Sequence, residues 1–554
     1  MTFEIARAHR RGFRNVGRSA LERGRRASVL SVLHLSLLCL PSLLAPPSVQ
    51  AQEMGDEPWF GLTLPPAFLP HSVPVLIGDR GPAPAVVPVG EEEFQDLEGE
   101  RLKRDLETIV DFSRESREER EIGEGMIWGR ITGFPSSRRT VEWSVEEFRD
   151  AGISDVELQE FDQDADAELW LPLSWEVRLL GSPAFGAGSR DVVLETAMPL
   201  APTEIPEGGL TAPLIYVGKA SAAEVEQMDV AGKIAVQHIT PQGHMVFERS
   251  PAAPRARALM EAGAVAVFNV VDLPGNERVR DLSNCGGPCF NLGGRDGHFL
   301  ASVLSAAAEA GITEAVRAEI RLETETFSGL SGVNGVAVIP GSELPDQTIV
   351  VNAHVDAWFD GAGDNGDGPA VMMGLARHFA RPEHHPRRTL VFVASAGHHS
   401  PGLHGPRRFV AMNPDLVEDA VLFLNIEHVA QRNISPARSE FEDGYRRWVA
   451  DAAEVPIVAG ITNASPFLER LVRRGVERYG TNFVSEPNPM ASGEGGGYRG
   501  RGVAVFTAMQ APPLYHTSGE VAEVVSAPGL ERMARFLAFF IDEVDGAAGD
   551  EINP

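Results

Sequence analysis

Residues 348–370, TIVVNAHVDAWFDGAGDNGDGPA, contain the pattern that decides the fold of this chain. Residues 348–353 are suited to a short buried strand, and His354 and Asp356 follow that strand directly. A glycine-rich turn, 361–368, then leads into the apolar segment 369–379, which is predicted to be helical. A buried strand with polar side chains at its carboxyl end, a turn and a helix are typical of an α/β domain that binds ligands at that edge of its sheet.

The same alternation continues on both sides of this stretch. Because strands that alternate with helices pair mainly in parallel, we predict an α/β fold with a mostly parallel twisted sheet and helices on both faces. The predicted helices are 94–116, 141–151, 369–379 and 529–541, and the predicted strands are 156–161, 348–353, 389–395, 420–426 and 503–509.

Residues 183–323 differ from the rest of the chain in their pattern of apolar residues. Short apolar runs separated by glycines, with one or two helices such as 253–262, predict a compact β-rich domain inserted into the α/β domain. The predicted organisation is a signal peptide (1–51), a linker or surface strap (52–95), the first part of the α/β domain (96–182), the insert (183–323), the α/β core (324–545) and a tail (546–554).

The first 51 residues resemble a leader. They contain eight arginines, then an apolar run at 29–44 that histidine and proline interrupt, and end in Val49-Gln50-Ala51. This predicts a cleaved signal peptide and a secreted or periplasmic protein with no membrane span after cleavage; an uncleaved anchor is the alternative. In an oxidising compartment, Cys285 and Cys289 are expected to form a disulfide rather than to remain free thiols.

The overall charge is strongly negative. The chain has 49 Lys and Arg against 78 Asp and Glu, a formal net charge of −29. Such a field repels phosphate backbones, so nucleic acid is not expected to be a partner. The sequence leaves the oligomeric state open.

Several common enzyme motifs are absent or misplaced. The glycines at 361, 363 and 366 match the spacing of a dinucleotide-binding turn, but seven residues separate them from the strand that such a turn follows immediately. The EF-hand frame would place glycines where calcium-binding carboxylates are required. The chain contains neither a His-Glu-x-x-His zinc helix nor a Gly-x-Ser-x-Gly nucleophile turn.

Four segments instead resemble the motifs of one enzyme family, both in their residues and in their order along the chain. Residues 354–358 (HVDAW), 363–368 (GDNGDG), 424–427 (LNIE) and 514–518 (LYHTS) are similar to the co-catalytic zinc aminopeptidase and glutamate carboxypeptidase family. The resemblance covers about residues 95 to 545. Within the insert, 216–218, 230–236 and 262–267 resemble a protease-associated domain.

The resemblance implies one or two zinc ions and a peptide substrate. His354 and Glu427 would hold the first zinc, His516 the second, and Asp364 would bridge them. Asp356, two residues after His354, would support that imidazole and so contribute to catalysis. By the same resemblance the substrate would contact Glu494, Tyr498 and Tyr515, although the glycine-rich stretch around Glu494 also fits a plain surface loop.

The chain departs from the family after the strand 389–395. Where the family has two consecutive glutamates, a general base and a ligand of the second zinc, this chain has His398 and His399. Histidine can do both tasks, so we predict that His399 binds metal with Asp364 and His516, and that His398 is the base. A solvated loop is the alternative.

We therefore expect a secreted zinc-dependent exopeptidase, of the aminopeptidase or carboxypeptidase type, that hydrolyses peptide bonds with a metal-activated water. A second hypothesis is a weakened or inactive pseudo-peptidase that binds peptides or protein partners. A third is another metal-dependent amide chemistry, such as cyclisation of an N-terminal glutamine.

Overall fold

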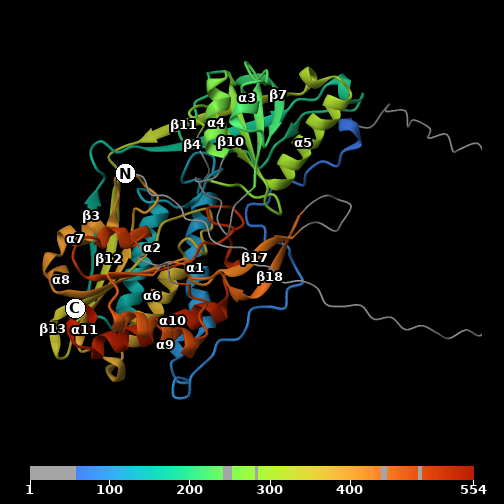
Figure 1. Cartoon of the computed structure of the whole chain (residues 1–554). Helices are drawn as coiled ribbons and strands as arrows, with labels where there is room; N and C mark the ends of the chain where they lie inside the picture. The colour runs from blue at the N-terminus through green and yellow to red at the C-terminus, as the bar shows by residue number, and fades with distance from the viewer. Residues whose placement is uncertain (1–57, 241–251, 281–284, 438–445, 459, 485–489) are drawn as a thin grey trace, which may run out of the picture. The chain divides into compact units, whose positions relative to one another are not determined.

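The computed structural model describes residues 58–240, 252–280, 285–437, 446–458, 460–484 and 490–554. The predicted signal peptide lies outside the described residues. Two large sheets organise the rest of the chain, one of seven strands and one of eight (Figure 1). In the part of the chain that the structure describes, no helix combines the length and the apolarity that crossing a bilayer requires.

The seven-stranded sheet carries the residues singled out in the sequence. Its four central strands are parallel, as expected. β19 pairs antiparallel with β20, β12 with β15, and β3 with β12, so the sheet is mixed. The strand order is β19 (Ile461–Thr462), β20 (Ala504–Met509), β16 (Ala420–Glu427), β13 (Leu344–His354), β15 (Arg388–Ser395), β12 (Ser331–Ile339) and β3 (Asp155–Asp162).

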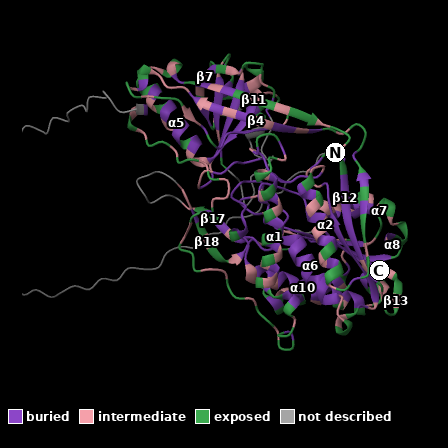
Figure 2. Ribbon diagram, turned by 180° about the vertical axis from the view of Figure 1, so that it is seen from behind, coloured by how far each residue is buried: buried purple, intermediate pink, exposed green. Residues whose placement is uncertain are grey.

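Both faces of this sheet are covered. Ile349 and Val351 of β13 pack into one apolar cluster and Val350 into another, because successive side chains of a strand point to opposite faces. β15 and β16 are accordingly buried over their whole length, and β13 is buried from Thr348 to His354. Figure 2 shows the buried residues in purple. The larger cluster contains α1 (Gly99–Glu118), α2 (Pro135–Asp150), α6 (Asp367–Phe379), α9 (Pro466–Tyr479) and α10 (Ala527–Gly546), and the smaller one contains α7 (Gly405–Met412) and α8 (Pro414–Glu418).

The eight-stranded sheet draws its strands from residues 169–327, a span that contains the predicted insert 183–323. Its identity as a protease-associated domain stays a prediction. Cys285 and Cys289 form a disulfide within it. The strand order is β5 (Val192–Val193), β4 (Leu169–Leu179), β11 (Arg317–Phe327), β7 (Leu210–Gly218), β8 (Ile234–Ile239), β9 (Ala266–Val271), β10 (Cys289–Leu292) and β6 (Met198–Pro199), and the helices include α4 (Ala252–Glu261) and α5 (Gly294–Glu309).

The segment before α1 is extended and held to the rest of the chain at several points. Asp79 forms an ion pair with Arg432 (2.7 Å), and Glu91 accepts a hydrogen bond from Tyr479 (2.8 Å). Trp59 is buried in the core of the second sheet, with its ring stacked on Phe185 at 5.2 Å. This segment therefore contributes to the core as well as crossing the surface.

A buried histidine on α6 gives the fold a predicted acid sensitivity. His378 is 1% exposed and packs against Phe94 and His384. Burial, reinforced by His384 and Arg381, lowers the pKa of His378 to about 3. The unfolded chain takes up a proton at this histidine near pH 6.5, but the folded chain does so only near pH 3. Below pH 6.5 protonation therefore favours the unfolded chain, and the free energy of unfolding falls as the pH falls.

We expect His378→Leu to reduce the loss of unfolding free energy between pH 6.5 and pH 5 by about 2 kcal/mol, measured by urea denaturation at both pH values. The exposed His385→Leu is the matched control and should leave the pH dependence unchanged. Equal pH dependence in wild type and His378→Leu would contradict the prediction.

Candidate metal centre

The polar residues singled out in the sequence meet at one edge of the seven-stranded sheet. His354 ends β13, Glu427 ends β16, and His398 and His399 follow β15. Because these three strands are parallel neighbours, their carboxyl ends lie side by side. Asp364 comes from the glycine-rich turn before α6, and His516 comes from the loop after β20.

Asp364 lies at the centre of the cluster. Burial disfavours its charged form, but the surrounding histidines outweigh burial and hold the pKa of Asp364 well below the ordinary value. Four imidazole Nε2 atoms lie near its carboxylate: those of His516 at 2.6 Å, His428 at 2.7 Å, His354 at 3.3 Å and His399 at 3.4 Å. The sequence prediction that distant segments converge on Asp364 therefore agrees with the geometry.

Asp356 connects two parts of the cluster. Its Oδ1 lies 3.4 Å from Nδ1 of His354, on the opposite side of the ring from Asp364. The same carboxylate accepts hydrogen bonds from the backbone N–H groups of His398 (3.2 Å) and His399 (2.9 Å). Asp356 thus orients His354 and anchors the turn that carries His398 and His399.

The residues present fit a zinc ion. The Nε2 atoms of His354 and His399 are buried and make no hydrogen bond with any described residue, although buried nitrogens normally have a partner. Burial lowers the pKa of His399 to about 4, so its imidazole is neutral at pH 7, the form that coordinates a metal. Histidine nitrogens and carboxylate oxygens are common zinc ligands.

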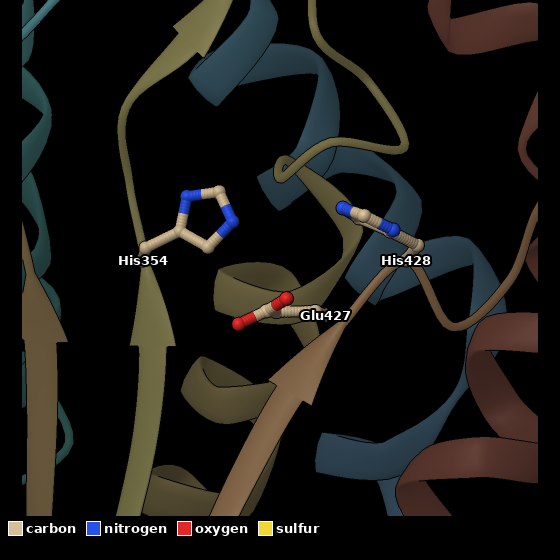
Figure 3. Close-up of side chains that lie close together, drawn as sticks. All are labelled: His354, Glu427 and His428. Carbon is tan, nitrogen blue, oxygen red and sulfur yellow. The ribbon is translucent and has the colours of Figure 1, made fainter. Parts of the chain in front are cut away.

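Two overlapping groups bring three potential ligand atoms within 4.8 Å of one another. They are His354, Asp364 and His399, and His354, Glu427 and His428. Figure 3 shows the second group, in which side chains from the ends of two neighbouring strands converge on one space. This arrangement offers enough ligands for one or two ions.

His428 is a residue that the sequence analysis missed. It follows Glu427 directly, and its backbone has a φ of 49°, which turns the chain sharply after β16. Its backbone N–H donates to Oδ1 of Asn365, and its Nε2 contacts Asp364. The only sequence signal was its place beside Glu427 at a strand end, and the family resemblance assigned that place to the glutamate alone.

His398 occupies a different position from its neighbour. Its Nδ1 lies 2.8 Å from Oε1 of Glu494, and its ring stacks on that of His354 at 4.3 Å. A carboxylate at Nδ1 holds the hydrogen there, which leaves Nε2 able to accept a proton. The backbone N–H of Glu494 donates to Glu427 (2.6 Å), so this pair is fixed against the candidate metal ligands.

Tyr498 and Tyr515, the two tyrosines predicted to contact the substrate, differ in position. The ring of Tyr515 stacks on His516 at 3.7 Å, so Tyr515 lies at the site. Tyr498 is 1% exposed, stacks on Phe423 beneath the sheet, and places its hydroxyl 3.1 Å from Asn352. The structure therefore does not bring Tyr498 to a position where it could contact a substrate.

An open pocket of about 260 Å³ adjoins the His398–Glu494 pair. It lies between the start of α7 and the short 3-10 helix Gly493–Tyr498. Glycines and basic side chains make up most of its lining, which consists of Gly493, Gly496, Gly497, Pro406, His398, His404, Arg407, Arg499 and the acidic Glu494.

Arg130 is a second residue that the sequence analysis missed. It is fully buried and donates hydrogen bonds to the backbone carbonyls of Val355 (2.8 Å), Asp360 (2.8 Å) and Gly361 (3.0 Å). These carbonyls belong to the segment that joins His354 to Asp364. Arg130 therefore fixes the path of the chain between two candidate ligands.

Comparisons with known proteins show a similarity to peptidases. Residues 334–541 match the family model described as Peptidase family M28. Aminopeptidase YwaD of Bacillus subtilis (strain 168) is 29% identical over 201 residues, 34% of this chain and 38% of the relative. Probable glutamate carboxypeptidase LAMP1 of Arabidopsis thaliana is 33% identical over 98 residues, 17% of this chain and 14% of the relative. The matches thus span less than two thirds of these relatives.

A solved structure confirms the fold. The zinc aminopeptidase BSAP from Bacillus subtilis aligns with 82% of this chain and 98% of its own chain, with a TM-score of 0.52 and 18% sequence identity. The α/β fold class predicted from the sequence is therefore confirmed.

Proposed function

We propose that this protein is a zinc-dependent exopeptidase that cleaves peptides, because residues 334–541 match the model of peptidase family M28. One observation carries the proposal: histidines and carboxylates from separate strands surround Asp364, and two of the buried imidazole nitrogens have no other described partner. Such a set of nitrogen and oxygen ligands suits a hydrolytic zinc site.

The candidate ligands would be divided between two zinc ions. His354 and Glu427 would hold a first zinc, His399 and His516 a second, and Asp364 both, while His428 offers a further nitrogen near Asp364. When bound, zinc supplies a Lewis acid that polarises the scissile carbonyl and activates water. The burial of these side chains would keep bulk water away from a bound metal.

The proton transfer would fall to His398. Its Nε2 accepts the proton from the attacking water and later returns it to the leaving amine, as a general base and then a general acid. Glu494, at Nδ1, orients the ring and stabilises the imidazolium that forms. The His398–Glu494 pair would thus replace the single glutamate base that the family resemblance implies at this position.

The remaining predictions from the sequence belong to the same proposal. The leader 1–51 would be cleaved and the enzyme would be secreted or periplasmic. Residues 183–323 would be a protease-associated insert between the two parts of the peptidase domain, 96–182 and 324–545. Residues 52–95 would be a linker or surface strap and 546–554 a tail.

The test measures zinc per purified chain and the hydrolysis of a pool of amino-blocked and unblocked peptides. We expect one or two zinc ions, and cleavage that a chelator removes and added zinc restores. Zinc without cleavage would support the pseudo-peptidase hypothesis instead. Conversion of an N-terminal glutamine to a ring, without hydrolysis, would support the cyclase hypothesis.

The basic lining of the pocket beside His398 gives a prediction about substrates. Arg407 is exposed there, near Arg499 and His404, so peptides with a carboxylate next to the scissile bond should bind better than neutral ones. We expect Arg407→Ala to raise KM for acidic peptides by about two- to fivefold without changing kcat, as the loss of an exposed ion pair predicts.

The matched control is Arg408→Ala. Arg408 is the next residue along the chain, but it pairs with Asp164 (2.7 Å) and does not line the pocket. It should leave KM unchanged for every peptide. An Arg407→Ala effect of equal size on acidic and neutral peptides would contradict the prediction.

A further inference from the structure

A buried segment between two strands of the second sheet forms hydrogen bonds with the loop that carries His516. The segment is 277–280, between β9 and β10, and Val279 forms an antiparallel bridge with Thr517. The backbone N–H of Arg280 donates to the carbonyl of His516 (2.9 Å), and that of Ser518 donates to the carbonyl of Arg278 (3.0 Å). We call residues 277–280 the clamp.

The side chain of Ser518 strengthens this contact. Its Oγ accepts a hydrogen bond from the backbone N–H of Arg278 (2.9 Å) and donates one to Glu277 (2.9 Å). Glu277, Arg278 and Ser518 are all buried, at 5%, 6% and 0% exposure. Water therefore does not compete for these bonds.

His516 needs an external restraint of this kind. Its backbone φ is 54°, a left-handed conformation that costs free energy for any residue with a side chain and persists only where neighbouring contacts impose it. The clamp bonds directly to the carbonyl of this residue. The conformation in turn directs Nε2 of His516 to within 2.6 Å of Asp364.

A second contact reaches another candidate ligand. The guanidinium of Arg280 lies 4.5 Å above the ring of Trp358, and that ring lies 5.9 Å from the ring of His399. The clamp therefore touches the surroundings of both histidines predicted to bind the second zinc.

The clamp is itself held by a ladder of buried polar side chains that crosses the second sheet. Gln237, Asn269 and Asn291 lie side by side on β8, β9 and β10 and are 0% exposed. Buried amides are costly unless they are paired, and here each one pairs with the next. The bonds run from Arg255 on α4 to Gln237 (2.6 Å), from Gln237 to Asn269 (2.6 Å), from Asn269 to Asn291 (3.0 Å) and from Asn291 to the carbonyl of Val279 (2.9 Å).

From these contacts we propose that the second sheet positions one of the ligands of the candidate metal centre. Its amide ladder fixes the clamp, and the clamp fixes His516 in the conformation that meets Asp364. Asn269, Asn291 and Ser518 are then positioning residues for zinc binding. The inference rests on the proposed function, because it takes His516 to be a zinc ligand.

The experiment uses the full chain, stripped of metal, and measures the zinc dissociation constant by competition with a chelating dye. Asn269→Leu keeps the side-chain size but removes the middle of the ladder, far along the chain from every candidate ligand. Ser518→Ala removes both side-chain bonds to the clamp. We expect Asn269→Leu to weaken zinc binding about tenfold and Ser518→Ala about 10- to 100-fold, the range for groups that orient metal ligands.

Thr203→Val is the matched control. Thr203 is also fully buried in the second sheet's domain, and its side-chain hydrogen bonds go to the backbone of Leu200 and Cys289, which belong to neither the ladder nor the clamp. It should lower thermal stability to a similar extent as Asn269→Leu and leave the zinc dissociation constant unchanged.

A second measurement does not depend on metal. Hydrogen exchange of the metal-free protein, followed by mass spectrometry, should show faster exchange at the amides of Arg280 and Ser518 in both variants and not in Thr203→Val. If wild type binds no zinc, the proposed function fails. If wild type binds zinc and Asn269→Leu matches it in affinity and exchange, only this inference is overturned.

Discussion

Replacement of Asp364 by asparagine is expected to abolish zinc binding and to lower peptide hydrolysis by about a thousandfold or more. Asparagine keeps the shape of the side chain and removes the negative charge that faces four imidazoles. A Lewis-acid metal contributes several kcal/mol to catalysis, and each 1.36 kcal/mol corresponds to about a factor of ten in rate. Zinc per chain and kcat/KM on the best peptide are the measurements.

Asp360→Asn provides the control for this variant. Asp360 lies four residues earlier in the same loop and is also buried, but it pairs with Arg114 (2.9 Å) and His71 (2.9 Å) rather than with the candidate ligands. It should retain zinc. Retention of zinc and activity by Asp364→Asn would show that the metal, if any, binds elsewhere.

The second large effect is expected from His398→Ala. The variant should lose about 100- to 10,000-fold in kcat, the usual contribution of a general base, and keep its zinc, because His398 faces Glu494 rather than Asp364. Glu494→Gln should give a smaller loss, since it leaves the imidazole in place and removes only the charge that stabilises its protonated form. Single-turnover kinetics and metal analysis distinguish the two roles.

His404→Ala is the control for His398, because His404 lines the same pocket without forming the pair. It should keep kcat. A His398→Ala variant with unchanged kcat would exclude His398 as the base. Loss of zinc from His398→Ala together with its retention by His399→Ala would mean that the two histidines have exchanged the roles proposed for them.

The fold was predictable because its signals are local. The apolar runs that end at His354 and Glu427 show which strands are central and where their carboxyl ends lie, and the glycines at 361–368 mark the turn between strand and helix. The antiparallel strands at the sides of the sheet were not predictable in this way. All the strands of the second sheet lie between β3 and β12 in the sequence, and nothing near either strand indicates that pairing.

The candidate site was predictable in part for the same reason. Histidines and carboxylates at strand ends could be identified, but side-chain direction could not. His428 enters the cluster because its φ of 49° turns the chain there, and Tyr498 leaves it because the short helix that ends at this residue directs the ring into the core. Arg130 and the clamp act through backbone carbonyls of distant segments, which leave no pattern in their own neighbourhood.

The most direct test of the account is a crystal structure of the purified protein, with anomalous diffraction collected on both sides of the zinc edge. The account predicts an anomalous zinc peak in contact with Asp364 and with at least two of the histidines around it. A protein loaded with zinc whose peak lies away from Asp364, or one that binds no zinc under any condition, would contradict it.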